Sequence, residues 1–238
     1  MKNFRMVCVG ALCAVGVVLC ASANQIQVGY PESNSGPYRS GDGGEFTVMP
    51  VNPSGWLSLG GYAAETMDIG IDGSFQTFCL EQREELGGYG ITYDAAVNTR
   101  AIFGGVGPSG DPLSIGAGFL YSQFVSGTLY KYDYTTTAGR KTSAGELQNA
   151  IWWLEDEGVA FDSNNIYMDY VVTWFGGQDQ AKAAGDSWNY GVRAMNLTDN
   201  VGSRYQDLLV KVPDAGLTMT LLGVAMGFMG LATRFAKK

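Results

Sequence analysis

Apolar residues along this chain alternate with polar ones in short runs, a spacing typical of strands. Runs of this kind lie at residues 75–81, 128–136, 190–196 and 205–212. Residues 24–61 carry only short apolar pieces between Gly, Pro, Ser and Asn, so this first third predicts turns that join short strands. The chain is therefore predicted to be rich in short strands.

The run at residues 75–81 carries the most chemical information. The Asp72-Gly73 pair before it predicts a hairpin turn. Side chains alternate along a strand, so Cys79 and Glu81 are expected on one face and Phe78 on the other. Cys79 is thereby predicted to have an ionisable neighbour.

Helical spacing replaces alternation in the middle of the chain. Helices are predicted at residues 115–125, 165–175 and 178–184. The first of these is expected to end before Gly127, because glycine commonly terminates helices. The blocks of strand and helix are separate, which predicts an α+β fold: one β-rich domain with a few helices, over residues 24–211.

A further helix is predicted to begin at Thr142 or Ser143, with Glu146 completing a capping box. Its inward stripe is formed by Leu147, Ala150, Ile151 and Leu154. Gln148 is then expected within the first two turns, where a side chain can point toward a neighbouring strand. The acidic run that follows, residues 155–157, is expected to be a solvated helix end.

Both ends of the chain carry targeting patterns. A charged start, an apolar run and the small residues Ala21-Ser22-Ala23 predict a signal peptide over residues 1–23. An apolar stretch at residues 217–233, followed by a basic tail, predicts a transmembrane helix. The domain between them is therefore predicted to be exported.

Composition narrows the chemistry. Residues 24–212 hold 22 acidic and 10 basic side chains, which argues against nucleic acid as a partner. The chain contains no histidine, so a histidine triad and a His-ligated metal are excluded, and no cofactor is expected. No motif places two carboxylates for hydrolysis, so we expect no turnover enzyme.

One cysteine, Cys79, remains after the predicted signal peptide. A solitary thiol in an exported protein forms no internal disulfide, so Cys79 is either a small buried hydrophobic residue or a group kept for its reactivity. The sequence alone leaves both open.

The carboxyl-terminal motif resembles the sorting signal of exosortase substrates, the PEP-CTERM class and especially its VPDSG-type variant. The motif consists of Val212, Pro213, Asp214, Ala215 and Gly216, with Ala215 where that variant usually has Ser. This resemblance implies processing by an exosortase. The protein would be held in the inner membrane of a Gram-negative bacterium by its terminal helix, and then released to the cell surface or extracellular matrix.

The middle of the chain resembles the Cys-Gln thioester domains of bacterial surface adhesins. The matching residues are Phe78-Cys79 and Gln148-Asn149-Ala150-Ile151-Trp152, and residues 117–124 resemble the helix that commonly lies between them. Leu147 stands where that family usually has Thr. The resemblance implies an internal Cys79–Gln148 thioester that an amine on another surface captures. Glu81 is a candidate proton shuttle for it.

One alternative to this hypothesis remains at the level of sequence. Cys79 could pack as an inert core residue while Gln148 faces solvent. The protein would then be a non-covalent structural or carbohydrate-binding matrix protein that uses exposed aromatic side chains. Trp152 and Trp153 are expected to pack in the core and not to form such a surface.

Overall fold

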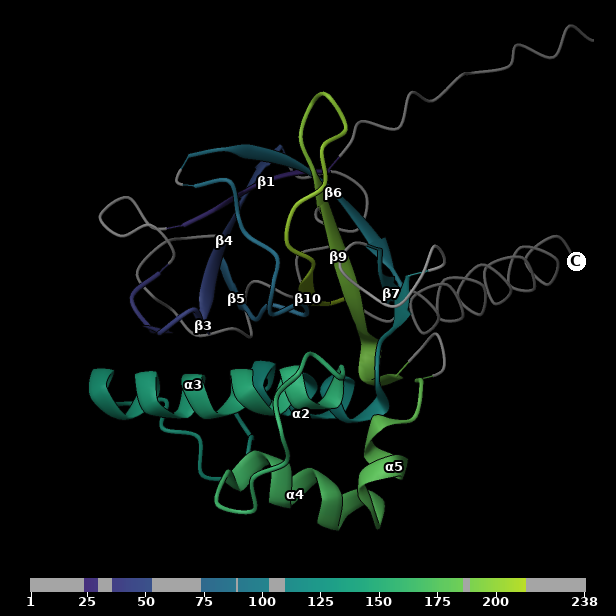
Figure 1. Ribbon diagram of the computed structural model, residues 1–238. Helices are drawn as coiled ribbons and strands as arrows, with labels where there is room; N and C mark the ends of the chain where they lie inside the picture. Colours follow the sequence, from purple (N-terminus) through teal and green to yellow (C-terminus); the bar gives the residue numbers. More distant parts are fainter. Residues whose placement is uncertain are drawn as a thin grey trace, which may run out of the picture.

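The computed structural model describes residues 24–29, 36–52, 74–88, 90–102, 110–185 and 189–212. Within them the protein combines an antiparallel sheet with four helices, as the expected mixture of strands and helices requires (Figure 1). The sheet contains β1 (Asn24–Val28), β4 (Phe46–Asn52), β5 (Phe75–Thr77), β6 (Thr92–Asn98), β9 (Val192–Thr198) and β10 (Leu208–Lys211).

The six strands follow the order β10-β9-β6-β1-β4-β5, and every neighbouring pair is antiparallel. The two outer strands then approach each other. Leu209 donates its N–H to the carbonyl of Phe78 at 3.0 Å, and Cys79 forms a bridge with Leu208. The sheet is therefore nearly closed, and Cys79 lies on the seam where its two edges meet.

Two short pairs of strands accompany the main sheet. These are β2 (Arg39–Ser40) with β3 (Gly43–Gly44), and β7 (Arg100–Ala101) with β8 (Asp111–Pro112). Strands β2 and β3 lie against α3, so this small hairpin fills the space between the helix and the start of β4.

The helices form layers on one side of the sheet. They are α2 (Ile115–Val125), α3 (Thr137–Leu154), α4 (Ile166–Phe175) and α5 (Gln178–Lys182). Helices α2 and α3 lie next to the sheet, whereas α4 and α5 lie beyond them (Figure 1). Helix α3 therefore has the sheet on one side and α4 on the other.

Two hydrophobic clusters meet at the seam. One lies among the helices and includes Phe78 and Leu80, and the other is enclosed by the sheet and includes Phe75 and Cys79. This division follows the alternation predicted for residues 75–81. Regular pairing of β5 with β4 ends at Thr77, however, and Cys79 instead forms an isolated bridge with Leu208 of β10.

A buried ion pair joins α3 to the sheet. The guanidinium of Arg140 binds Glu45, just before β4, through Nε–Oε1 and Nη2–Oε2 contacts of 2.7 Å each. The hydroxyl of Tyr132 donates to Glu45 Oε1 at 2.5 Å, and Arg140 stacks over the ring of Tyr38 with 3.9 Å between Cζ and the ring centroid. These contacts satisfy a charged pair that burial would otherwise disfavour.

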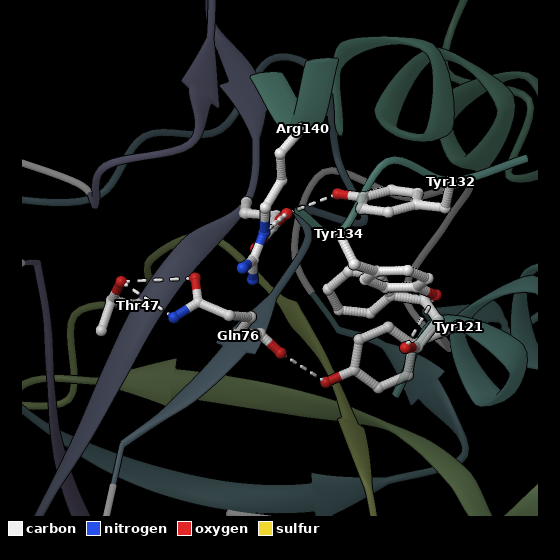
Figure 2. Close-up of polar contacts among 8 residues, drawn as sticks. Thr47, Gln76, Tyr121, Tyr132, Tyr134 and Arg140 are labelled. Atoms are coloured by element: carbon white, nitrogen blue, oxygen red, sulfur yellow. Dashed lines mark hydrogen bonds and ion pairs between the residues drawn. The ribbon is translucent and has the colours of Figure 1, made fainter. Parts of the chain in front are cut away.

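The same region carries a second polar network (Figure 2). Gln76 of β5 donates its side-chain N–H to the hydroxyl of Thr47 of β4 at 3.2 Å. The main-chain carbonyl of Gln76 accepts a hydrogen bond from the Tyr121 hydroxyl of α2 at 2.9 Å. Arg140 lies about two turns before Gln148 on α3, and Gln76 lies three residues before Cys79. The two networks therefore hold both elements that carry the predicted pair.

The predicted helices at 115–125, 165–175 and 178–184 are confirmed as α2, α4 and α5. The inward stripe of α3 is also confirmed, because all four of its members are buried, and Trp152 and Trp153 lie in the core as predicted. The closing strands are confirmed as β9 and β10, although both are shorter or shifted relative to the predicted runs.

Two local predictions are wrong. Residues 128–136 form turns instead of a strand, and α3 begins at Thr137 and not at Thr142 or Ser143. Asp133 organises this entry by accepting hydrogen bonds from the N–H groups of Thr135 and Thr136, and the Thr136 hydroxyl caps Gly139. Ser143 lies inside the helix, so Gln148 falls beyond its second turn.

Several sequence predictions lie outside the described residues. These are the signal peptide at 1–23, the Asp72-Gly73 turn, the motif residues Pro213, Asp214, Ala215 and Gly216, and the apolar stretch at 217–233. Among the helices of the described ranges, none has the length and apolar character needed to cross a membrane.

The ion pair gives a test of how α3 is held. Replacing Arg140 by Met is expected to lower the free energy of unfolding by about 3–5 kcal/mol, because Glu45 would keep a buried charge without its partner. Urea titration with an unchanged m value measures this loss. The double variant Arg140→Met with Glu45→Leu removes both charges and is expected to lose less; equal stability of wild type and Arg140→Met would contradict the assignment.

Candidate functional site

The candidate site begins with a gap in the hydrogen bonding of the sheet. Leu80 donates to Asp207 at 2.9 Å and Leu209 donates to Phe78 at 3.0 Å, so the bonds of the seam lie on either side of Cys79. In antiparallel pairing this geometry turns the N–H and C=O of Cys79 away from β10. On that other side β4 has no paired residue beyond Phe46, which is opposite Thr77. The main chain of Cys79 therefore needs a partner from elsewhere.

Gln148 of α3 supplies that partner. The N–H of Cys79 donates to Gln148 Oε1 at 3.1 Å, and Gln148 Nε2 donates to the carbonyl of Cys79 at 2.8 Å. Both residues are buried, with 1% of Gln148 and 5% of Cys79 exposed. A single carboxamide thus satisfies both main-chain groups of Cys79, 69 positions away in sequence.

Glycine at position 43 makes this contact possible. A Cβ atom on Gly43 would lie 2.3 Å from Cγ and 3.0 Å from Cδ of Gln148, and 2.9 Å from Cη2 of Trp152. These distances are too short for a side chain, so β3 can approach α3 closely only with glycine here. Gly43 and Trp152 then enclose the Gln148 side chain.

The thiol of Cys79 is protonated in this environment. Burial raises its pKa well above the usual range; the positive charge of Arg39 opposes the shift and the negative charge of Glu84 adds to it. The sulfur is therefore a neutral thiol at physiological pH. Any reaction at Cys79 must pass its proton to another group at the moment of attack.

A cavity of about 470 Å³ connects this buried residue with the surface. Cys79 contributes to its wall together with charged side chains from the β2–β3 hairpin and from the segment after Cys79, namely Arg39, Asp42, Arg83, Glu84 and Glu85. A small polar molecule can approach Cys79 from this cavity. The site therefore combines a dry contact between Cys79 and Gln148 with a polar entrance.

Glu84, and not Glu81, lines this cavity with Cys79. Burial, followed by the charges of Asp207 and Glu157, raises the pKa of Glu84 to about 8. A carboxyl group with this pKa can hold or accept a proton near neutral pH. The sequence contained a signal for it, because three glutamates follow Cys79 within six residues, but alternation pointed to Glu81 instead.

Glu81 lies in a cluster of carboxyl groups together with Glu84, Glu157 and Asp207, but it does not line the cavity. Burial raises its pKa to about 10, and contact with Glu157 together with the charges of Glu84 and Asp207 adds to the shift. Glu81 is therefore protonated at neutral pH, and the charged groups that act on the Cys79 thiol are Arg39 and Glu84. The proton-shuttle role of Glu81 stays a prediction, and Glu84 is better placed for it.

The structure thus brings the two predicted thioester residues into contact. Gln148 is buried, which differs from the solvent-facing position of the inert interpretation. Of the sorting-motif residues, Val212 is described, and its N–H donates to Gly191 at 2.7 Å. This contact places the start of the motif directly after β10.

The acidic run at 155–157 is not uniformly solvated as predicted. Glu155 is buried and accepts hydrogen bonds from the N–H and hydroxyl of Ser114, at 3.1 and 2.6 Å. Burial raises the pKa of Glu155 to about 8. This carboxyl group joins the end of α3 to the start of α2, and the described part of the chain contains no group of three or more ligands suited to a metal ion.

Two hydrogen bonds fix the position of the Gln148 carboxamide beside Cys79. Its oxygen already accepts an N–H bond, and that bond would strengthen as negative charge develops on the oxygen, as in an oxyanion hole. Its nitrogen is held by the Cys79 carbonyl, which fixes the plane of the amide. The nucleophilic sulfur is on the same residue that provides both contacts.

Comparisons of the chain with protein-family models, with curated proteins and with solved structures found no match.

The contact between Gln148 and Cys79 also predicts a stability effect. Gln148→Ala leaves a buried N–H and a buried C=O without partners, and is expected to lower the free energy of unfolding by about 2–6 kcal/mol. Asn149→Ala, on the exposed side of the same helix, is the matched control and is expected to change it by less than about 0.5 kcal/mol. Equal stability of the two variants in urea titrations would contradict the hydrogen bonding described here.

Proposed function

We propose that this protein forms an internal thioester between Cys79 and Gln148 and uses it once, to attach covalently to a surface that bears amines. The observation that carries the proposal is the pair of hydrogen bonds between the Gln148 carboxamide and the main chain of Cys79. The contact is buried, so few water molecules can reach the acyl group at one time. Such a protein is an adhesin and not a turnover enzyme.

Formation of the thioester is a substitution at the Gln148 carboxamide. The Cys79 sulfur attacks Cδ, the C–S bond forms and the C–N bond breaks; the thiol proton passes to the departing nitrogen, which leaves as ammonia. Holding the reacting groups together replaces a slow encounter in solution, which matters because an amide is a poor electrophile. No oxidant, metal or cofactor takes part.

In the capture step, nitrogen is the nucleophile and the Cys79 sulfur is the leaving group. The nitrogen of an incoming amine attacks the thioester carbon, a C–N bond forms and the C–S bond breaks, and a proton from the amine passes to the sulfur. The cavity beside Cys79 gives the amine a polar route to the acyl group. Before the attack, Glu84 in its ionised form accepts one proton from the incoming ammonium group, because only the neutral amine has the lone pair needed to attack.

Export and sorting complete the proposal. The signal peptide predicted at residues 1–23 and the motif from Val212 to Gly216 support secretion followed by exosortase processing. The described fold lies between these two segments. The protein would thus reach the cell surface or extracellular matrix of a Gram-negative bacterium with its acyl group already formed.

Mass spectrometry tests thioester formation directly. The intact protein is expected to be lighter than its sequence by one ammonia, and methylamine is expected to add to it. A thioester that has hydrolysed no longer shows the loss of ammonia, because water has been added back, but Gln148 is then recovered as glutamate in peptide maps. Cys79→Ala is the control and should have the mass of its sequence. An unshifted mass, with Gln148 intact and Cys79 freely alkylated in the native protein, would reject the proposal.

The role of Glu84 predicts a pH dependence of capture. Because its pKa is about 8, the fraction of carboxylate rises through that pH, and the rate of reaction with hydroxylamine should rise with it. Glu84→Gln is expected to slow capture by about 10²-fold and to remove this inflection while the ammonia loss persists. Glu81→Gln is the comparison variant, and a larger effect there would reassign the role.

A further inference from the structure

An exposed group of aromatic side chains lies on α4 and its neighbours, away from the Cys79 cavity. Trp174 has 59% of its surface exposed, although it stacks on the buried ring of Phe119 with 4.9 Å between centroids and 22° between planes. Because the rings are nearly parallel, Phe119 supports one face of the indole and the opposite face is turned outward. Trp174 is therefore a flat apolar surface on a rigid base.

Three tyrosines extend this surface. Tyr170, one turn earlier on α4, lies 6.2 Å from Trp174, and Tyr130 lies 5.4 Å from Tyr170, measured between ring centroids. Tyr190 packs edge-on against Phe119 at 5.5 Å. Tyr130 and Tyr190 are 48% and 41% exposed. We call Tyr130, Tyr170, Trp174 and Tyr190 the aromatic platform.

The composition of the platform indicates its partner. Of the large apolar side chains exposed in the described ranges, the three on this surface are all aromatic, and the other two, Val51 and Val201, lie elsewhere. Sugar rings present C–H groups on their faces and hydroxyls at their edges, so they stack on aromatic rings and hydrogen-bond to groups beside them. The tyrosine hydroxyls and the exposed Asp169 and Thr173 of α4 provide such polar groups.

The charge of the protein narrows the class of polysaccharide that the platform could bind. The chain has a formal net charge of −8, and Asp169 and Asp179 lie on α4 and α5. The cations nearby are Lys131, over the ring of Tyr130, and Lys182 of α5, which is paired with Asp156. This balance opposes an acidic polysaccharide and an anionic membrane. A neutral polysaccharide meets no such repulsion.

We propose that the aromatic platform binds a neutral polysaccharide non-covalently. Helix α4 lies on the side of α2 and α3 that faces away from the sheet, so the platform is separate from the seam at Cys79 (Figure 1). Reversible binding at this surface is independent of thioester formation. It would hold the protein on a glycan-rich surface, with or without covalent capture.

Affinity electrophoresis of the full chain tests this proposal, with Cys79→Ala as the background that removes covalent capture. Native gels cast with hydroxyethylcellulose, xyloglucan, dextran or glycol chitin are compared with gels that lack polysaccharide. Retarded migration in at least one of them is expected. Trp174→Ala is expected to weaken that binding at least about tenfold, which corresponds to about 1.4 kcal/mol.

Controls separate a lost contact from a lost fold. Val201→Ala removes an apolar side chain that is 80% exposed outside the platform and should leave binding unchanged. Tyr130→Ala is expected to weaken binding without uncovering Phe119. It is therefore the substitute test of the platform if Trp174→Ala unfolds. Unretarded migration in all four gels, or retardation that neither variant reduces, would overturn the proposal. Trp174-dependent dimerisation in sedimentation, or binding to phosphatidylcholine vesicles, would identify a different partner and also overturn it.

Discussion

A strand edge that no neighbouring strand covers is the constraint from which the site arises. The sheet closes on itself at Cys79, but the closing bonds on either side leave the main-chain groups of that residue pointing into a dry space. Unpaired groups in such a space are costly, so a carboxamide from α3 is placed there. The requirement is structural, and the same contact holds the Gln148 carboxamide next to the residue that carries the thiol. The local stability of the seam therefore depends on one pair of hydrogen bonds, and the proposed thioester would form at the same place.

The surrounding packing keeps this contact in place at both ends. Arg140 and Glu45 hold α3 against the start of β4, while the Gln76 network holds β5. Gly43 lets the small hairpin cover the carboxamide closely. Polar groups thus fix the relative position of helix and sheet, where apolar packing alone would allow small shifts. A reaction that needs contact between two particular atoms benefits from this restriction.

The sequence predicted the helices and strands better than it predicted which side chains contact one another. The limits of α2 followed from an apolar run and a terminal glycine, whereas the start of α3 was missed because its first turn is polar and is capped through Asp133 and Thr136. Periodicity identified the inward stripe of α3 but said nothing of Gln148, whose partners are main-chain atoms far away in sequence. Glu84 was missed because alternation describes a regular strand, and regular pairing ends at Thr77.

The position of the seam has a mechanical consequence. The chain leaves the sheet through β10, the strand that bridges to Cys79, and Val212 follows directly. A pulling force applied beyond Val212 would first load the β9–β10 ladder and the bridge to Cys79. Hydrogen bonds to Gln148 and apolar contacts are what join Cys79 to α3 under that load. A covalent link between Cys79 and Gln148 would carry tension from β10 into α3 without relying on those contacts.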